Sequence, residues 1–297
     1  GMSFEFLFEF LHGCHVFYLT RVPSPAIIAQ AFKDVKPAIV IAVPLVIEKI
    51  IRKKVFPQIQ NTKVKLLMKM PGVGKKVKKR ICEQVYQAFG GNLYEVIIGG
   101  AALNQEIESF LKDIDFPFTV GYGATECAPI ITYSDWHDFV PMSCGREVVH
   151  MEVKIDSENP ETVPGEILAR GLNVMLGYYK NDEATAQTID KDGWYHTGDL
   201  GLMDNGGNVF IKGRSKNMLL GPNGQNIYPE EIEDKLNSMT FAMESVVVQR
   251  DGKLVGLVHP DFDEVQAMGL SRDDLQSLME ENRVQVNANL PVYCKIA

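Results

Sequence analysis

Two short apolar runs, each ending in a glycine-bearing loop, constrain the fold of this 297-residue chain most strongly. The run 93–98 leads into a Gly-Gly pair, the run 118–120 leads into Gly121, and a helical pattern separates the two. A third apolar run, 38–43, precedes an amphipathic helical pattern over 45–55. Short buried strands that alternate with helices predict a parallel sheet flanked by helices.

The pattern changes after about residue 145, where short strands alternate with turn clusters. From Lys216 onward, a helix start with acidic residues in its first turn is followed by a strand pattern. The predicted elements of this region are strands over 151–155, 165–170 and 208–212, a helix over 229–237 and a strand over 244–249.

We therefore expect an α/β protein in three parts. Residues 1–145 would form a partial parallel α/β subdomain that carries the adenine and phosphate loops. Residues 146–215 would form a small β-rich subdomain with a ribose-binding loop. Residues 216–297 would form a truncated, mobile α+β C-terminal domain.

Cysteine content and charge bear on the compartment and the partners. Five cysteines, an odd number without a CxxC pair, favour reduced thiols and a cytoplasmic protein. The net charge is −8, yet the segment from Lys33 to Arg80 holds 14 Lys or Arg against two acidic residues. A basic run at 75–80, with Val73, Val77 and Ile81 spaced four apart, indicates an amphipathic helix. We expect no nucleic-acid partner and hypothesise peripheral contact with an anionic membrane at its inner face.

The loop after the run 118–120 has the chemical parts of a nucleotide site. Glycines such as Gly123 allow a backbone to approach a phosphate closely, and a Tyr ring such as that of Tyr122 can stack on a base. The hydroxyl of Thr125 can donate to a phosphoryl oxygen, and the carboxylate of Glu126 is a hard oxygen ligand suited to Mg²⁺. An ordinary strand-to-loop turn could contain the same residues, so this loop alone decides nothing.

Two further loops are candidates for ligand binding. Gly100, Ala101 and Ala102 form a small-residue loop at a predicted strand end, where open α/β sheets collect ligands. In the stretch 193–201, Asp199 lies close to two glycines, and such a carboxylate suits recognition of a ribose diol. A hairpin with an acidic turn is the alternative for this stretch.

These loops, followed by Gly213-Arg214-Ser215-Lys216 and by the stretch 224–233, resemble in their order the adenylate-forming superfamily. That superfamily contains acyl-CoA synthetases, adenylation domains and luciferases. Val43-Pro44 and Glu48-Lys49-Ile50 are similar to a segment of the long-chain acyl-CoA synthetases. The resemblance covers almost the whole chain.

The resemblance implies a two-step reaction. A long-chain fatty acid carboxylate attacks the α-phosphate of ATP to give acyl-AMP, and the thiol of CoA then displaces AMP to give the thioester. Mg²⁺ is the implied cofactor, with Glu126 as its ligand, and ATP and CoA are cosubstrates. Catalytic roles fall to Thr125, Glu126 and the hinge residue Lys216. Nucleotide and CoA contacts fall to Gly100, Ala101, Ala102, Tyr122, Gly123, Asp199, Arg214 and Gly224.

Two parts of the family pattern do not occur in this sequence. No Ser/Thr/Gly-rich phosphate loop precedes Gly99, and no lysine in the catalytic context follows the segment 290–295. We therefore expect this piece to be inactive alone in the first half-reaction, whatever the parent enzyme does. The alternatives are an adenylation domain acting on another carboxylic acid and a non-catalytic nucleotide-binding remnant.

Overall fold

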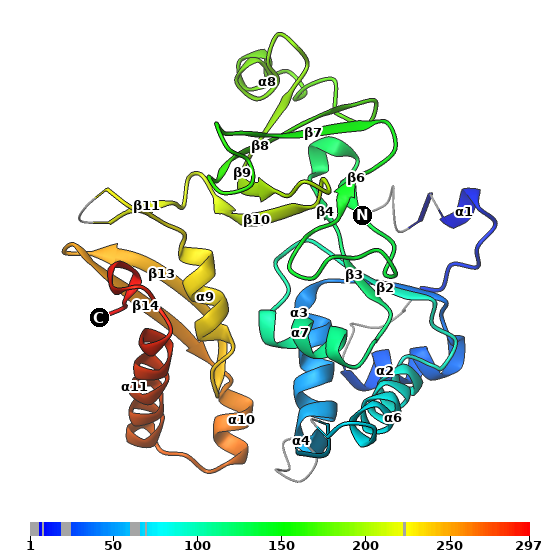
Figure 1. Ribbon diagram of the computed structural model, residues 1–297, viewed down its shortest axis with the longest axis vertical. Coiled ribbons are helices and arrows are strands. Elements are labelled where there is room, and N and C mark those ends of the chain that lie inside the picture. The colour runs from blue at the N-terminus through cyan, green and yellow to red at the C-terminus, as the bar shows by residue number, and fades with distance from the viewer. Residues whose placement is uncertain (1–5, 8, 19–24, 60–65, 69, 222–223) are drawn as a thin grey trace. The chain divides into compact units, whose positions relative to one another are not determined.

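A computed structural model of the chain describes residues 6–7, 9–18, 25–59, 66–68, 70–221 and 224–297 (Figure 1). The chain divides into two compact units. The first comprises Gly1–Lys154, Leu168–Thr197 and Met203–Phe210, and the second comprises Ile155–Ile167, Gly198–Leu202 and Ile211–Ala297. The α/β fold with a parallel sheet is confirmed, whereas the three-part division at residues 145 and 215 stays a prediction.

A three-stranded parallel sheet forms the centre of the first unit. Its strands follow the order β1-β2-β3, and the register pairs Val40 with Val96 and Val96 with Phe118. All three strands were predicted, because each is a short apolar run that ends at a Gly or Pro. The strands are β1 (Ile39–Ala42), β2 (Glu95–Ile98) and β3 (Phe118–Val120).

Helices connect these strands, as parallel pairing requires. Phe32 from α2 stacks on the fully buried Phe89 with ring centroids 5.2 Å apart, and Phe89 also contacts Phe116 at 5.5 Å. These rings pack α2 and the end of α6 into one core. The helical segments are α1 (Glu9–Leu11), α2 (Pro25–Val35), α3 (Pro44–Ile50), the π-helix η2 (Ile51–Val55), α4 (Phe56–Ile59), α6 (Val73–Ala88) and α7 (Gln105–Asp113).

A small antiparallel sheet follows β3 in the same unit. It has the order β4-β5-β6 and pairs Tyr122 with Thr132 and Thr132 with Glu147. A 3-10 turn, η3 (Thr125–Cys127), separates its first two strands. The strands are β4 (Tyr122–Gly123), β5 (Ile130–Tyr133) and β6 (Arg146–Glu147).

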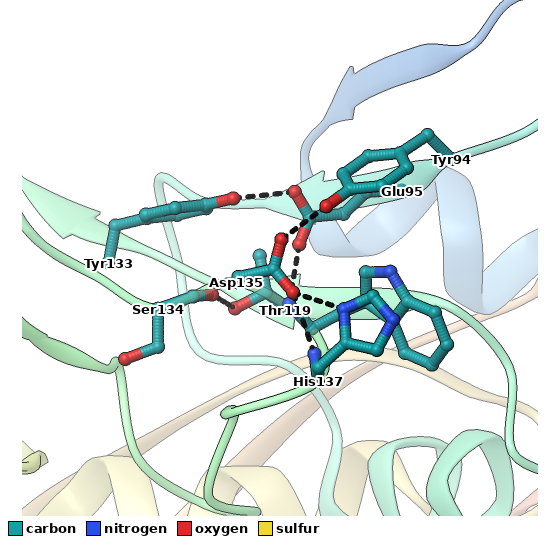
Figure 2. Close-up of polar contacts among 8 residues, drawn as sticks. Tyr94, Glu95, Thr119, Tyr133, Ser134, Asp135 and His137 are labelled. Atoms are coloured by element: carbon teal, nitrogen blue, oxygen red, sulfur yellow. Dashed lines mark hydrogen bonds and ion pairs between the residues drawn. The ribbon is translucent and has the colours of Figure 1, made fainter.

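A buried carboxylate holds the end of β5 against β2 (Figure 2). Glu95 is 1% exposed and accepts hydrogen bonds from Tyr133 Oη at 2.6 Å and from the backbone N–H of Trp136 at 2.8 Å. Thr119 Oγ1 of β3 donates to the carbonyl of Ser134 at 2.7 Å. Burial raises the pKa of Glu95, and the two donors oppose that shift.

A second, more exposed carboxylate extends this network. Tyr94 Oη donates to Asp135 Oδ2 at 2.6 Å, and the imidazole Nδ1 and backbone N–H of His137 contact Asp135 Oδ1 (Figure 2). Burial opposes a low pKa for Asp135, but the hydrogen bonds from Tyr94 and His137 outweigh it and hold the pKa below its usual value. The loop 133–137 is therefore fixed to the parallel sheet by side chains.

A four-stranded sheet has the order β10-β9-β8-β7. Asn181 caps the helix between β8 and β9 by accepting a hydrogen bond from the N–H of Ala184 at 3.1 Å. The predicted strands over 151–155, 165–170 and 208–212 all occur here. The elements are β7 (Met151–Asp156), β8 (Gly165–Gly171), α8 (Asp182–Thr188), β9 (Tyr195–Met203) and β10 (Val209–Arg214).

In the C-terminal part of the second unit, α9 packs against a two-stranded antiparallel sheet and α11 packs against α9 (Figure 1). Its core consists of apolar side chains contributed by helices and strands: Ile227, Ile232, Leu236, Val247, Leu254, Val286 and Ile296. The elements are β11 (Leu219–Leu220), β12 (Asn226–Ile227), α9 (Pro229–Asn237), β13 (Ala242–Arg250), β14 (Lys253–Pro260), α10 (Phe262–Ala267), α11 (Arg272–Ala288) and the 3-10 turn η4 (Val292–Cys294).

The helix and strand predicted over 229–237 and 244–249 are both present. Pro229 stands at the first position of α9, where its missing N–H costs no hydrogen bond, and Glu230 and Glu231 follow in the first turn. Within the described ranges, no helix is long and apolar enough to cross a membrane.

Candidate functional site

The carboxyl ends of the parallel strands bring two predicted loops together. The N–H of Gly99 donates to the carbonyl of Ala42 at 3.2 Å, and the N–H of Gly121 donates to the carbonyl of Ile98 at 2.9 Å. A methyl group added to Gly99 would lie 3.4 Å from the carbonyl oxygen of Gly121. The loops after β2 and β3 are therefore direct neighbours at the sheet edge where α/β proteins bind ligands.

The loop after β2 presents its backbone to solvent. Gly100, Ala101 and Ala102 are all exposed, and Gly100 has a φ of +86° that favours glycine. Beyond the loop, the side chain of Asn104 caps α7, and the N–H of Asn104 donates to Glu48 Oε1 at 3.0 Å. Glu48, from the segment similar to long-chain synthetases, thus fixes the end of this loop.

The loop after β3 needs glycine at one position for steric reasons. A methyl group on Gly123 would lie 2.0 Å from the carbonyl oxygen of Pro129, which is closer than any real contact. Tyr122 is buried, whereas Thr125 is exposed on the 3-10 turn. The contact of Tyr122 with adenine and that of Thr125 with phosphate stay predictions.

Glu126 interacts with two tyrosines, Tyr178 and Tyr195, that lie far from it in the sequence. Tyr178 Oη donates to Glu126 Oε1 at 2.8 Å, and this hydrogen bond raises the pKa of Tyr178. Burial raises the pKa of Tyr195, and the neighbouring Glu126 carboxylate raises it further. The backbone of Glu126 is also engaged, because its carbonyl accepts from the N–H of Met175 at 2.7 Å.

Asn173, in the same segment as Met175 and Tyr178, fixes the loop after β3. Its Nδ2 donates to the carbonyl of Cys127 at 2.6 Å and to that of Ile130 at 2.9 Å. The Gly-Tyr-Tyr pattern at 177–179 is the one sequence signal that could have identified this segment as part of the site. Residues 173–178 therefore orient the loop that carries Thr125 and Glu126.

The predicted ribose residues form an ion pair in the second unit. Asp199 Oδ1 lies 3.0 Å from Arg214 Nε; the side chain of Asp199 is 11% exposed, and that of Arg214 is 67% exposed. The N–H of Gly198, which has a φ of +72°, donates to Glu166 Oε1 at 2.9 Å. The N–H of Ser215 donates to the carbonyl of Gly198 at 2.9 Å. These backbone contacts fix the carboxylate of Asp199 close to the guanidinium.

The aromatic cluster near Asp199 has local packing partners. The ring centroid of Trp194 lies close to two cations, with Lys154 Nζ at 4.2 Å and the guanidinium carbon of Arg170 at 4.5 Å. His196 lies 3.8 Å from a carboxylate oxygen of Asp190. Trp194 and His196 therefore both have contacts within the protein itself.

Glu230, from the stretch 224–233, holds the turn that contains Arg214 and Lys216, a role that the sequence pattern did not indicate. Its Oε1 accepts from the N–H of Arg214 at 3.3 Å and from Asn217 Nδ2 at 2.8 Å. A methyl group on Gly213 would lie 2.4 Å from Glu230 Oε2, so a larger residue there would displace the Glu230 carboxylate. Lys216 is exposed in this turn.

Gly224 is also exposed and has a φ of +80°. The predicted residues thus form two groups that belong to different units. The first unit contains the loops with Gly100 and Glu126, and the second contains Asp199, Arg214, Lys216 and Gly224.

The acidic side chains of the described residues fit a Mg²⁺ ion only where phosphates of a nucleotide supply further oxygen ligands. In the part of the chain that the structure describes, no group of three or more His, Cys, Asp or Glu side chains could hold a metal ion. Mg²⁺ commonly uses one or two carboxylates together with substrate phosphates. Glu126, oriented by the hydroxyl of Tyr178, can supply one such carboxylate.

Comparison with known proteins adds family information. A family model described as "AMP-binding enzyme" matches residues 1–179. Long-chain-fatty-acid–CoA ligase ACSBG2 of Rattus norvegicus is 30% identical over 251 residues, which is 77% of this chain and 36% of the rat protein. 4-Coumarate–CoA ligase 1 of Glycine max is 38% identical over 177 residues, which is 55% of this chain and 60% of the soybean protein.

Among solved structures, O-succinylbenzoate coenzyme A synthetase from Bacillus subtilis, in complex with AMP, superimposes with a TM-score of 0.68. Its sequence identity is 20%, so the similarity shows the fold alone; it covers 97% of this chain and 52% of that protein. This chain therefore spans 36% of the rat ligase and about half of the bacterial synthetase.

Proposed function

This chain belongs to the AMP-binding enzyme family, and from that premise we propose that it forms part of an ATP-dependent acyl-CoA ligase. The observation that carries this proposal is the adjacency of the Gly99–Ala102 and Gly121–Glu126 loops at the carboxyl edge of the parallel sheet. Exposed backbone, a hydroxyl and an oriented carboxylate meet there. Such groups suit a nucleotide whose phosphates must be approached closely.

In the first half-reaction, the acid carboxylate attacks the α-phosphorus of ATP and pyrophosphate leaves. Gly100, Ala101 and Ala102 line the adenine pocket together with Tyr122. Thr125 donates its hydroxyl proton to a phosphoryl oxygen. When bound at Glu126, Mg²⁺ offsets the negative charge on the phosphate oxygens. The hydroxyl of Tyr178 keeps the Glu126 carboxylate in one orientation during this step.

For the sugar of the nucleotide, we assign Asp199 as the acceptor of the ribose hydroxyl protons. Its carboxylate is mostly buried and already aligned by Arg214, so little side-chain entropy is lost on binding. Arg214 is exposed and can reach the same sugar while keeping its ion pair. This assignment treats the two residues as a preformed unit.

In the second half-reaction, the thiol of CoA attacks the acyl carbonyl and AMP leaves. We assign Lys216 to the hinge about which the C-terminal domain turns between the two steps, because it lies exposed in a turn. The loop at Gly224 would border the pantetheine tunnel. Its positive φ suits a backbone that approaches a ligand, and a methyl group built on it would meet no described atom within 4 Å.

For the acid, we propose a long-chain fatty acid. Support comes from the Val43-Pro44 and Glu48-Lys49-Ile50 segments and from a relative named for long-chain fatty acids. A second candidate is a different carboxylic acid, because another relative is named for 4-coumarate. Two stable adenylate mimics, palmitoyl- and coumaroyl-sulfamoyladenosine, separate these candidates when titrated calorimetrically beside AMP.

Burial of the apolar tail predicts at least about tenfold tighter binding of the palmitoyl mimic than of AMP or the coumaroyl mimic. A coumaroyl mimic that binds as tightly as the palmitoyl mimic would contradict the long-chain assignment and leave the nucleotide site standing. Lack of binding by all three compounds would contradict the ligase proposal itself.

We also propose that the protein is cytoplasmic and makes peripheral contact with the inner face of an anionic membrane. The five cysteines, Cys14, Cys82, Cys127, Cys144 and Cys294, are all free thiols. Reduced thiols support a cytoplasmic location. The strongly basic segment 33–80 supports the membrane contact.

A further inference from the structure

The basic run of the sequence forms an exposed face of helix α6. The only acidic residue of that helix, Glu83, accepts a hydrogen bond from Gln87 at 2.8 Å, and Lys78 pairs with Asp113. The remaining cations are exposed, and within the described ranges their side chains have no hydrogen bond or ion pair. They are Lys75, Lys76, Lys79 and Arg80, and we call them the basic face.

The predicted amphipathic helix is confirmed as α6, and most of its apolar stripe faces the protein interior. Val73 is 42% exposed, but Val77 is half-buried and Ile81 is only 6% exposed. The stripe turns into the protein as the helix proceeds and packs against its interior. Only its first residue remains available to an external partner.

Other apolar side chains take its place just before the helix. Leu66 is 65% exposed, Leu67 38% and Met70 45%, and with Val73 they form what we call the apolar corner. The corner is held to the helix, because the N–H of Gly74 donates to the carbonyl of Met70 at 2.8 Å. The N–H of Met70 in turn donates to the carbonyl of Leu67 at 3.2 Å.

Gly74 makes this close packing possible. A methyl group there would lie 2.3 Å from the carbonyl oxygen of Met68, so the first turn of α6 lies directly against the helical turn 66–68. The apolar corner and the basic face are therefore contiguous parts of one surface. Four large aliphatic side chains gathered within eight residues are more than the scattered exposed side chains of an ordinary surface.

We propose that the apolar corner and the basic face together form a docking surface for an anionic lipid bilayer. Aliphatic side chains enter the boundary between headgroups and acyl chains, while lysines and arginine stay at the level of the lipid phosphates. Proteins that bind single-stranded nucleic acid stack bases on aromatic rings, and both parts of this surface lack aromatic residues. This surface would make the membrane contact proposed above, and its binding to vesicles can be measured independently of ligase activity.

The test is co-sedimentation of the chain with vesicles of phosphatidylglycerol mixed into phosphatidylcholine, beside vesicles of phosphatidylcholine alone. Each cation near an anionic surface contributes about 1 kcal/mol, or about fivefold in the partition coefficient. Removing the four charges by Lys75→Gln, Lys76→Gln, Lys79→Gln and Arg80→Gln should weaken binding by at least about 10²-fold. The matched control removes four exposed cations elsewhere by Lys191→Gln, Arg250→Gln, Lys253→Gln and Arg272→Gln.

A second variant tests the apolar corner separately. Leu66→Ser with Met70→Ser removes two exposed side chains and should weaken binding about tenfold while leaving its salt dependence unchanged. Thermal melting of each variant establishes that it is folded. Comparable losses in the basic-face variant and its control would overturn the proposal, as would equal binding to both vesicle types. Binding to an RNA oligonucleotide without binding to anionic vesicles would also overturn it.

Discussion

Replacing Glu95 tests the buried network that fixes the loop 133–137 to the parallel sheet. Glu95→Ala removes the acceptor of two hydrogen bonds, from Tyr133 Oη and the N–H of Trp136. An unsatisfied buried donor costs about 1–3 kcal/mol, and removing a buried carboxylate recovers part of its desolvation penalty. We expect a net loss of about 2–4 kcal/mol in the free energy of unfolding.

Glu95→Gln should behave differently at neutral pH. The amide oxygen can still accept from the N–H of Trp136, while the amide N–H₂ can donate to Tyr133 Oη, whose own proton is free to turn away. Both contacts survive, and we expect a loss under about 1 kcal/mol. If Glu95→Gln were destabilised as much as Glu95→Ala, the charge of Glu95, and not its hydrogen bonds, would hold the loop.

The difference in stability between the wild type and Glu95→Gln should depend on pH. Because the folded-state pKa of Glu95 is raised, the folded chain binds this proton more tightly than the unfolded chain. The associated stability is complete below the unfolded pKa of about 4.3 and is lost as the pH rises through the folded pKa. Relative to Glu95→Gln, the wild type should therefore lose stability as the pH rises from 4.

Urea unfolding followed by tryptophan fluorescence measures these differences, because both tryptophans, Trp136 and Trp194, lie in the first unit. Linear extrapolation gives the free energy of unfolding at each pH. The lost hydrogen bonds predict that Glu95→Ala lowers the free energy of unfolding by about 2–4 kcal/mol. A difference from the wild type of less than about 0.5 kcal/mol would refute the reasoning.

Two further substitutions probe the candidate site. Tyr178→Phe removes the hydroxyl that donates to Glu126. In calorimetric titrations, this variant should bind Mg·ATP several-fold more weakly than the wild type and should bind AMP as the wild type does. Equal losses of affinity for both ligands would contradict a role at the metal. Glu230→Ala removes the acceptor of the Arg214 N–H, so amide exchange at Arg214 should quicken about tenfold. Unchanged exchange there would mean that the turn is held without Glu230.

The sequence predicts the elements of this fold well where one run of residues carries the whole signal. The strands near 93–98 and 118–120 are short apolar runs that end at glycine, and both lie in the parallel sheet. Their shared direction places both following loops at one edge, so the adjacency of these loops follows from topology. The helix beginning at Pro229 is likewise marked by its own first turn.

The contacts that hold the site could not be predicted from local patterns. Tyr178 and Glu126 are 52 residues apart, and Glu95 and Trp136 are 41 apart, so their pairing depends on tertiary packing. Glu230 accepts a hydrogen bond from the N–H of Arg214, 16 residues away, and its carboxylate lies beside Gly213. Side-chain hydrogen bonds between distant elements leave no periodicity in the sequence.

The orientation of the apolar stripe on α6 could not be predicted for a related reason. A spacing of four residues places Val73, Val77 and Ile81 on one face of a helix, but it does not say which way that face points. The structure turns Ile81 inward, where it packs in the interior. Burial of a helix face is decided by its neighbours and not by its own sequence.

The central claim is that this chain binds the nucleotide of an acyl-CoA ligase with Asp199 at the ribose. Calorimetric titration with AMP tests it most directly, using the wild type, Asp199→Ala and the matched control Asp192→Ala, which removes an exposed carboxylate. Hydrogen bonds to a charged acceptor contribute about 1.5–3 kcal/mol each. We predict saturable binding by wild type and control, and at least about tenfold weaker binding by Asp199→Ala. Equal affinity of all three proteins for AMP, or no binding by any of them, would contradict the account.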